Sequence, residues 1–444
     1  MDGQSKRGWI TFASATLVLV AVTASTLVLA TVTRYGLGLS PDSRGYLLAA
    51  EQFAADRTIR VPDRAGELAP MTQFPPGLPV VLGLAIDAGF DAEHVARWIN
   101  VGGLSVLAVF AVILARLGGA RWPVAFVAGT IIAASAQLVS VHAMLWSEPL
   151  ANVLLVGGLV LLVMHVRGRG GRVGPWLIVA AGLFAAATMV RYAAIAAVVG
   201  AIIALLTAAG SRHHRLASAA VMGVVGAGPF TLWAWRNHTL TGRASGRELA
   251  FHPPSAGDIT SFAEAIGDWV LALRWVPNGL AAVVGVALVI AFVVVIRKGQ
   301  DRSEPRPAAL FRVVGWYVLA YFVFLLVSLT FVDAHTPVDS RILSPFRVVM
   351  PVVLVVGAAA ALERSRDLSK RWLLAGLATL LVLQTAYIGT WAWAARAEYL
   401  GFRGDEFRLS PTLAFVRDEL PPEALVYTNV PDVLFLLQGR SAKP

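Results

Sequence analysis

Long apolar blocks constrain this chain more than any other feature of its sequence. The first block runs from Thr11 to Val32, and similar blocks recur up to about residue 394. A helix needs about 20 consecutive apolar residues to cross the hydrocarbon core of a bilayer. Only 14% of the 444 residues are charged, whereas average soluble domains carry about 25%. We therefore predict an all-α polytopic membrane protein.

Eleven blocks are long enough to be predicted as membrane spans. They run at about 11–32, 97–117, 123–142, 148–166, 175–190, 192–209, 216–237, 278–296, 311–331, 345–362 and 372–394. The first is long enough to be a retained signal-anchor. A further stretch, Leu78–Phe90, follows Pro75-Pro76-Gly77 and is only about 13 residues long. It is too short to span comfortably, so we expect a helix lying in the membrane interface.

The basic residues indicate which side each loop faces. The formal charge of +10 comes largely from short loops between apolar blocks, where it sets membrane orientation. We therefore expect no nucleic-acid partner. With the N-terminus inside, the segments assigned to the cytoplasm hold 18 basic and 5 acidic residues, and the rest holds 19 and 22. Counting Leu78–Phe90 as a span would turn the Arg-rich loop 167–172 outward, against this rule.

The predicted topology is thus a multi-pass cell-membrane protein with a cytoplasmic N-terminus and an outer C-terminus. Residues 1–394 form the membrane module, and its outer loop 33–96 contains interfacial helices. Residues 395–444 form a short non-cytoplasmic segment. Its residues 425–438 resemble the strand and helix that open a soluble domain, which raises the question of truncation.

Two carboxylates are predicted at the outer membrane face. Asp42 begins a stretch in which Leu47, Ala50 and Phe53 have helical spacing, which predicts an amphipathic interfacial helix. Glu148 stands between a serine and a proline at the outer start of a span. Both residues also fit a simple helix-start role. Because both residues are predicted on the same membrane face, the alternative is that they form a catalytic pair of carboxylates.

Cationic side chains are predicted on the same face. Arg191 lies between two apolar blocks, either as a phosphate ligand or as an arginine that reaches up to the lipid headgroups. His335, Arg341 and Arg347 fall in one outer segment. They form either a cationic site or a headgroup anchor. The sequence contains no phosphate-binding glycine loop, no H-E-x-x-H and no G-x-S-x-G motif, and its lack of cysteine excludes thiol chemistry.

Four segments together resemble the GT-C glycosyltransferase superfamily, in particular the branch with protein O-mannosyltransferases and lipid A aminoarabinose transferases. In chain order they are Asp42–Ala50, Phe74–Pro79, Trp235–Gly242, and Asp339–Arg341 with the following Pro345 and Pro351. The resemblance covers most of the chain up to about residue 394. One departure is Gln73-Phe74, where some relatives have a lysine before the Pro-Pro pair.

The resemblance implies transfer of a sugar from a polyprenyl-phosphate donor on the outer face. It implies Asp42 as the base, Glu148 as a carboxylate that positions acceptor or metal, and Arg191 and Arg341 as phosphate ligands, with His335 a weaker candidate. Neighbouring candidates for substrate binding are Arg44, Tyr46 and Tyr192. The expected partners are the donor, membrane lipid, and an acceptor glycan, lipid or protein. The sequence requires no cofactor and leaves a divalent cation open.

Two other function classes stay open from the sequence. A lipid or polysaccharide flippase would carry ionisable residues or unwound helices at mid-depth, whereas the candidates here gather at one face. The second class is a non-catalytic assembly subunit, because Asp42 and Glu148 could each do no more than cap a helix.

Overall fold

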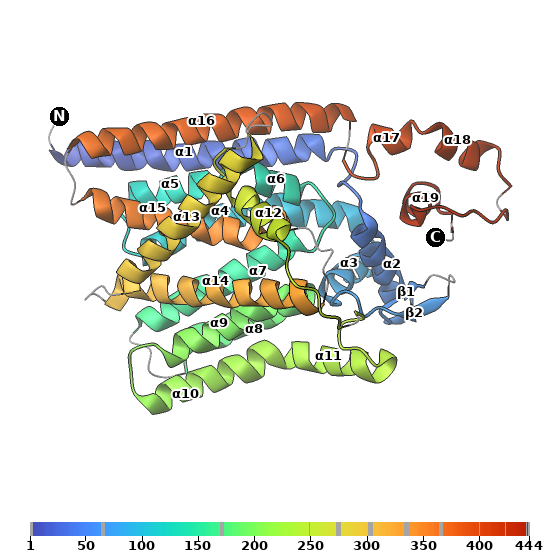
Figure 1. Ribbon diagram of the computed structural model, residues 1–444, viewed down its shortest axis with the longest axis horizontal. Coiled ribbons are helices and arrows are strands. Elements are labelled where there is room, and N and C mark those ends of the chain that lie inside the picture. The colour runs from blue at the N-terminus through green and yellow to red at the C-terminus, as the bar shows by residue number, and fades with distance from the viewer. Residues whose placement is uncertain are drawn as a thin grey trace.

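The computed structural model describes most of the chain. The described residues are 3–63, 67–168, 173–247, 249–271, 277–300, 305–332, 338–363, 367–398, 400–421, 423–440 and 442. They form a helical bundle that is elongated along one axis (Figure 1). The strands among them form one short antiparallel hairpin, in which Val61 pairs with Ala69.

The bundle is built from long helices and from spans made of shorter pieces. The long helices are α1 (Gly3–Val32), α4 (Ala92–Leu117), α7 (Glu148–Arg167), α13 (Asn278–Gln300), α14 (Pro305–Phe331), α15 (Ser344–Leu362) and α16 (Asp367–Glu398). The shorter pieces are α5 (Trp122–Ala133), α6 (Ala136–His142), α8 (Pro175–Val190), the 3-10 turn η1 (Tyr192–Ala194), α9 (Ile195–Leu206), α10 (Arg212–Val221), the π-helical turn η2 (Met222–Gly226) and α11 (Ala227–Thr241).

Smaller elements lie outside the long helices. They are α2 (Pro41–Asp56), β1 (Arg60–Pro62), β2 (Leu68–Pro70), α3 (Gly77–Asp87), α12 (Ala256–Gly267), α17 (Asp405–Arg408), α18 (Pro411–Asp418) and α19 (Pro431–Gln438). The helix α2 starts where the Asp42 segment predicted an interfacial helix, and α3 matches the short apolar stretch after Pro75-Pro76. Except for α12, all of them gather at the end of the bundle opposite the N-terminus (Figure 1).

The all-α polytopic fold is confirmed, and each of the eleven predicted spans coincides with a helix or a run of helices. In the part of the chain that was described, seven helices are long and apolar enough to cross a membrane. The α5–α6 pair, bent by 51°, makes an eighth if counted as one span. The helices α8 and α9 are shorter apolar helices. The number eleven therefore stays a prediction.

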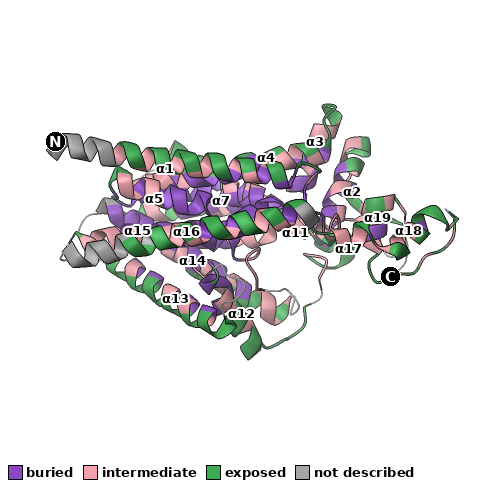
Figure 2. Cartoon of the chain, turned by 90° about the horizontal axis from the view of Figure 1, so that it is seen from above, coloured by how far each residue is buried: buried purple, intermediate pink, exposed green. Residues whose placement is uncertain are grey.

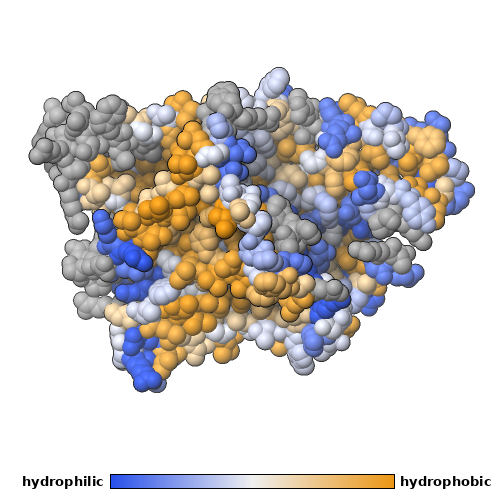
Figure 3. Space-filling model, in the orientation of Figure 1, coloured by the Kyte–Doolittle hydropathy of each residue, from blue (hydrophilic) through white to orange (hydrophobic). Residues whose placement is uncertain are grey.

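The surface of the bundle fits a lipid environment. Apolar side chains such as Leu19 on α1, and Val283 and Ile290 on α13, are exposed. An apolar belt covers α13 and α14, and hydrophilic residues lie toward both ends of the long axis (Figure 3). Exposed apolar side chains between polar ends are what a membrane-spanning bundle presents to lipid.

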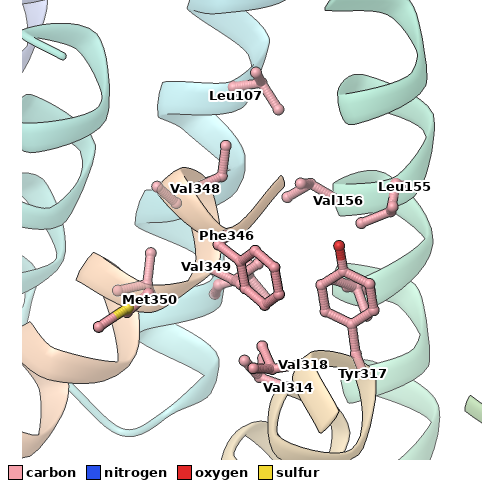
Figure 4. Packing of buried hydrophobic residues seen from close by; sticks show 14 of the residues in the cluster. Leu107, Leu155, Val156, Val314, Tyr317, Val318, Phe346, Val348, Val349 and Met350 are labelled. Carbon is pink, nitrogen blue, oxygen red and sulfur yellow. The ribbon is translucent and has the colours of Figure 1, made fainter. Parts of the chain in front are cut away.

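The centre of the bundle is α7, which contacts α4, α8, α14 and α15. Buried residues gather on α7 and its neighbours, whereas α1, α13 and α16 turn exposed faces outward (Figure 2). Tyr317 of α14 and Phe346 of α15 are buried against Val156 of α7 (Figure 4). Within lipid, such packing is stabilised by van der Waals contact rather than by the hydrophobic effect. This close packing fixes the start of α7, which carries Glu148.

Small residues bring α12 and α13 into close contact. A β-carbon on Gly267 or on Gly285 would lie 1.8 Å from a backbone oxygen of the facing helix, at Ala281 and Ala263 respectively. Only glycine fits at such distances, as is common between membrane helices.

Candidate active site

Asp42 lies in the first turn of α2 but does not cap this helix. Ser40 precedes the helix, and its backbone N–H donates to the Ser43 hydroxyl over 2.9 Å. Pro41 occupies the first helical position, where no backbone donor is needed. The Ser43 hydroxyl in turn donates to the Leu145 carbonyl over 2.9 Å, which anchors α2 against the segment before α7. The Asp42 carboxylate points instead at Arg341.

Glu148 is the first residue of α7 and lies inside the protein. Its side chain is only 1% exposed, whereas that of Asp42 is 23% exposed. It accepts a hydrogen bond from the Arg341 Nε and pairs with an Arg191 guanidinium nitrogen at 2.5 Å. A buried carboxylate is tolerated when paired cations and hydrogen bonds satisfy it. Glu148 is thus the buried counter-ion of two arginines.

Arg341 bridges the two carboxylates. Its Nε donates to Glu148 and its Nη2 to Asp42, and its guanidinium lies 4.4 Å from the centre of the Trp146 ring, a favourable cation–π distance. Burial lowers the pKa of Arg341, but the carboxylates of Glu148 and Asp42 outweigh this, so its pKa is raised above the ordinary value.

The loop that carries Arg341 is held from both sides. The Asp339 carboxylate accepts from the backbone N–H groups of Arg341 and Ile342, at 2.9 and 3.0 Å. The Tyr321 hydroxyl of α14 donates to the Ile342 carbonyl over 2.8 Å. These bonds fix the loop before α15 against α14, so the guanidinium is positioned before any ligand arrives.

Arg191 reaches the same centre because the chain is extended there. Its φ and ψ of −150° and 124° interrupt helical structure between α8 and η1. The Arg191 side chain points to Glu148 at 2.5 Å and is 18% exposed. The four residues Asp42, Glu148, Arg191 and Arg341 therefore form one connected ionic cluster, which we call the carboxylate–arginine cluster.

Arg247 is a further cation near this cluster that sequence reasoning missed. It interacts electrostatically with Asp42 and Arg191. Its loop follows α11 and is held by Asn237, whose amide donates to the Ala244 carbonyl over 3.0 Å. The available signal was the Trp235–Gly242 segment of the resemblance, because it holds Asn237, which positions the residues just beyond it. Arg247 thus adds a third guanidinium group near the two carboxylates.

Three predicted substrate-binding residues have other partners. Arg44 pairs with Asp432 of α19 at 3.4 Å and lies 4.7 Å from the Phe435 ring centre, away from the cluster. Tyr46 is buried, and its hydroxyl donates to Ser147 over 3.1 Å. Burial raises the pKa of Tyr46 above its ordinary value. Tyr46 thus packs beneath the cluster.

Tyr192 joins loops rather than the carboxylates. Its hydroxyl donates to the Thr72 carbonyl over 2.9 Å and accepts from Trp233 over 3.0 Å and from Asn237 over 3.2 Å. Tyr192 therefore ties the loop after β2 to α11.

The predicted cationic site of His335, Arg341 and Arg347 is only partly described. His335 lies outside the described residues. Arg347 donates to the Ser135 hydroxyl over 2.8 Å and lies 5.2 Å from the Trp269 ring centre, so its partners differ from those of Arg341. Grouping Arg341 with Arg347 was wrong in this respect. Arg341 contacts Glu148 at the start of α7, whereas Arg347 contacts Ser135 between α5 and α6.

The cluster differs from a metal site. Among the described residues, no three His, Cys, Asp or Glu side chains are placed to hold a metal ion. The guanidinium of Arg341 stands between the two carboxylates, where a bridging cation would bind.

Solved structures with a similar fold exist for this chain, although its sequence matches no known family. No protein-family model matches the chain, and no curated protein matches it in sequence. The Archaeoglobus fulgidus oligosaccharyltransferase, solved with a tethered acceptor peptide, is 14% identical with a TM-score of 0.57 over 91% of this chain and 57% of its own. In complex with an inhibitory peptide and a dolichol-phosphate, the A. fulgidus oligosaccharyltransferase AglB gives 13% identity and a TM-score of 0.54 over 91% and 58%.

ArnT from Cupriavidus metallidurans, solved with undecaprenyl phosphate, aligns over 92% of this chain and 82% of its own, with 16% identity and a TM-score of 0.44. This chain spans less than three fifths of the length of the archaeal oligosaccharyltransferase. The match to that enzyme covers 91% of this chain, and at this level of identity it establishes the fold. The chain therefore has the fold of this archaeal oligosaccharyltransferase, as the resemblance to GT-C glycosyltransferases led us to expect.

Proposed function

We propose that this protein is a membrane glycosyltransferase that moves a sugar from a polyprenyl-phosphate donor to an acceptor hydroxyl on the non-cytoplasmic face. The observation that carries the proposal is the pair of unlike carboxylates joined by Arg341. Asp42 is partly exposed and Glu148 is buried. A substrate reaches only the first of them.

Asp42 is the base in this proposal. A general base must lie within hydrogen-bond reach of the proton that it removes, and the exposed carboxylate of Asp42 meets that condition for an acceptor bound at the surface. The acceptor oxygen bonds to the anomeric carbon while the bond from that carbon to the phosphate oxygen breaks. The acceptor proton passes to Asp42, and polyprenyl phosphate leaves.

The arginines bind the phosphate that departs. Arg191 and Arg341 both contact Glu148, and Arg247 interacts electrostatically with Asp42 and Arg191, so three guanidinium groups gather where an anion would bind. Arginine presents a planar fork of donors that matches phosphate. Glu148 pairs with the guanidinium groups of Arg191 and Arg341. It thereby positions them to stabilise the negative charge that develops on the leaving oxygen.

A lipid-linked donor fits the place of the site. The cluster lies at the starts of α2, α7 and α15, at one end of an apolar bundle. A polyprenyl chain in the membrane would keep the phosphate at that depth. The dolichol-phosphate in the AglB complex is a lipid of this class. The flippase alternative gains no support from the solved structures matched here, which are glycosyltransferases.

The donor is tested by mass spectrometry of lipids that co-purify with the protein, followed by titration with undecaprenyl phosphate. We expect a polyprenyl phosphate in the wild type and a loss of affinity in Arg341→Lys, which keeps the charge but cannot bridge. The matched control is Arg417→Lys, an exposed arginine on α18. Equal affinity of wild type and Arg341→Lys would remove Arg341 from the phosphate site.

A further inference from the structure

A cavity with a mixed apolar and acidic lining lies next to the start of α2. It has a volume of about 600 Å³ and lies between Leu39–Pro41 at the start of α2, Met144, and residues of the 401–407 segment that follows α16. Ligand sites commonly measure about 300–1,000 Å³. We call it the α2–α17 cleft.

The walls of this cleft are fixed to each other. The Phe402 backbone N–H donates to the Leu39 carbonyl over 2.9 Å. Gly401 lies at a φ of +59°, and a β-carbon there would lie 2.1 Å from the Leu39 oxygen. Arg403 pairs with Glu93 of α4 at 2.6 Å. The segment after α16 is thus attached to the membrane bundle by backbone and side-chain bonds.

The cleft is lined by the residues that directly precede the proposed base. Ser40 and Pro41 line it, and Asp42 is the next residue. The Ser40 hydroxyl accepts a hydrogen bond of 2.9 Å from the Trp146 indole, whose ring carries the Arg341 guanidinium. A ligand lying against Ser40 and Pro41 therefore contacts the first turn of α2, from which the Asp42 side chain reaches Arg341.

The chemistry of the lining distinguishes the cleft from the phosphate site. Asp405 and Glu406 line it, together with Phe402 and Phe407, whose rings meet edge to face at 5.3 Å. Asp405 pairs with Arg408 at 2.7 Å, and Glu406 is exposed. Ionised carboxylates only accept hydrogen bonds, so they suit hydroxyl donors and repel phosphate. Aromatic rings offer an apolar surface beside these polar groups.

We propose that the α2–α17 cleft binds the acceptor as an uncharged saccharide, with hydroxyls on Glu406 and Asp405 and the reacting hydroxyl toward Asp42. The identification of the bound saccharide as the acceptor rests on the proposed function. A neutral saccharide has hydroxyl groups that can donate hydrogen bonds to the carboxylates, and apolar ring faces that can pack on the aromatic rings. The phosphate of the sugar donor binds the arginines instead.

The absence of cysteine from the chain allows a clean test. Glu406→Cys is labelled with a bulky methanethiosulfonate reagent, and donor and acceptor KM are compared before labelling, after labelling and after reduction. We expect at least a tenfold rise in acceptor KM on labelling, reversal by reductant, and unchanged affinity for undecaprenyl phosphate. The control is Glu419→Cys, which lies on the same segment outside the cleft.

Full labelling of Glu406→Cys with unchanged acceptor KM would overturn the inference. If the wild type transfers no sugar from any polyprenyl-phosphate donor, the proposed function fails and the cleft is judged by protection instead. Maltotriose and mannotriose are then tested for slowing the labelling of Glu406→Cys relative to Glu419→Cys. Slower labelling supports a saccharide site, and equal rates with both sugars overturn it.

Discussion

At the scale of single residues, the two carboxylates have different environments and therefore different expected roles. Glu148 is buried between two guanidinium groups, whereas Asp42 is partly exposed and meets one of them. Breaking a buried ion pair leaves an uncompensated charge and costs about 3–5 kcal/mol. Exposed pairs contribute about 0–1 kcal/mol.

Glu148→Gln is therefore expected to lower stability by about 3–5 kcal/mol, because Arg191 and Arg341 lose their shared counter-ion. Asp42→Asn is expected to change stability by about 1 kcal/mol or less. Thermal unfolding of both variants in the same detergent measures the difference. Equal loss of stability in the two variants would contradict the assignment of Glu148 as the buried counter-ion.

The phosphate ligands are tested by a substitution that keeps their charge. Arg191→Lys and Arg341→Lys are each expected to weaken undecaprenyl-phosphate binding by about 1.5–3 kcal/mol, which is roughly 10- to 160-fold. The physical reason is that lysine cannot present the planar fork. Binding is measured by titration. Unchanged affinity in either variant removes that residue from the phosphate site.

At the scale of elements, α11 positions the loop that carries Arg247. Asn237 is buried and bonds to both the Ala244 carbonyl and the Tyr192 hydroxyl. Asn237→Ala should therefore weaken donor binding by about 1–3 kcal/mol, although it touches no donor. The control is Thr239→Ala, an exposed position that bonds only within its own helix.

The mechanism of that effect is checked by a double-mutant cycle. If Asn237 acts through Arg247, the two substitutions share one effect and Asn237→Ala/Arg247→Ala binds donor about as well as Arg247→Ala alone. Additive losses would show that Asn237 acts through another part of the site.

Helix geometry explains which site residues were predictable from the sequence. Asp42 and Arg44 are two positions apart on α2, so they are about 200° apart around its axis. The structure accordingly turns Asp42 to Arg341 and Arg44 to Asp432. Tyr46, four positions after Asp42, shares its face and lies beneath the cluster. Considering this rotation would have removed Arg44 from the expected site.

Other parts of the site could not be read from the sequence. Apolar blocks define where helices run, and the shared side of Asp42, Glu148, Arg191 and Arg341 followed from the order of those blocks. That Arg341 bridges two carboxylates depends on a loop fixed by Asp339 and Tyr321. Arg247 lies in irregular chain after α11, where no periodicity indicates the direction of a side chain.

At the scale of the whole molecule, the topology predicted from the loop charges places the site on the outer face. Single cysteines replacing Glu67 and Glu419 should react with an impermeant reagent added to whole cells. Cysteines replacing His213 and Lys298 should be shielded. All four positions are exposed, and the parent chain has no cysteine, so any difference reports the side of the membrane. Labelling of His213→Cys from outside would reverse the proposed orientation.

The central claim is sugar transfer with Asp42 as the base, and it is measured directly in proteoliposomes with a polyprenyl-phosphate sugar and the acceptor. Asp42→Asn keeps the shape of the side chain and loses only its charge and its capacity to take a proton. The account predicts that turnover falls by roughly 10²–10⁴-fold, while thermal stability and undecaprenyl-phosphate affinity stay near those of the wild type. Transfer by Asp42→Asn at close to the wild-type rate would contradict it.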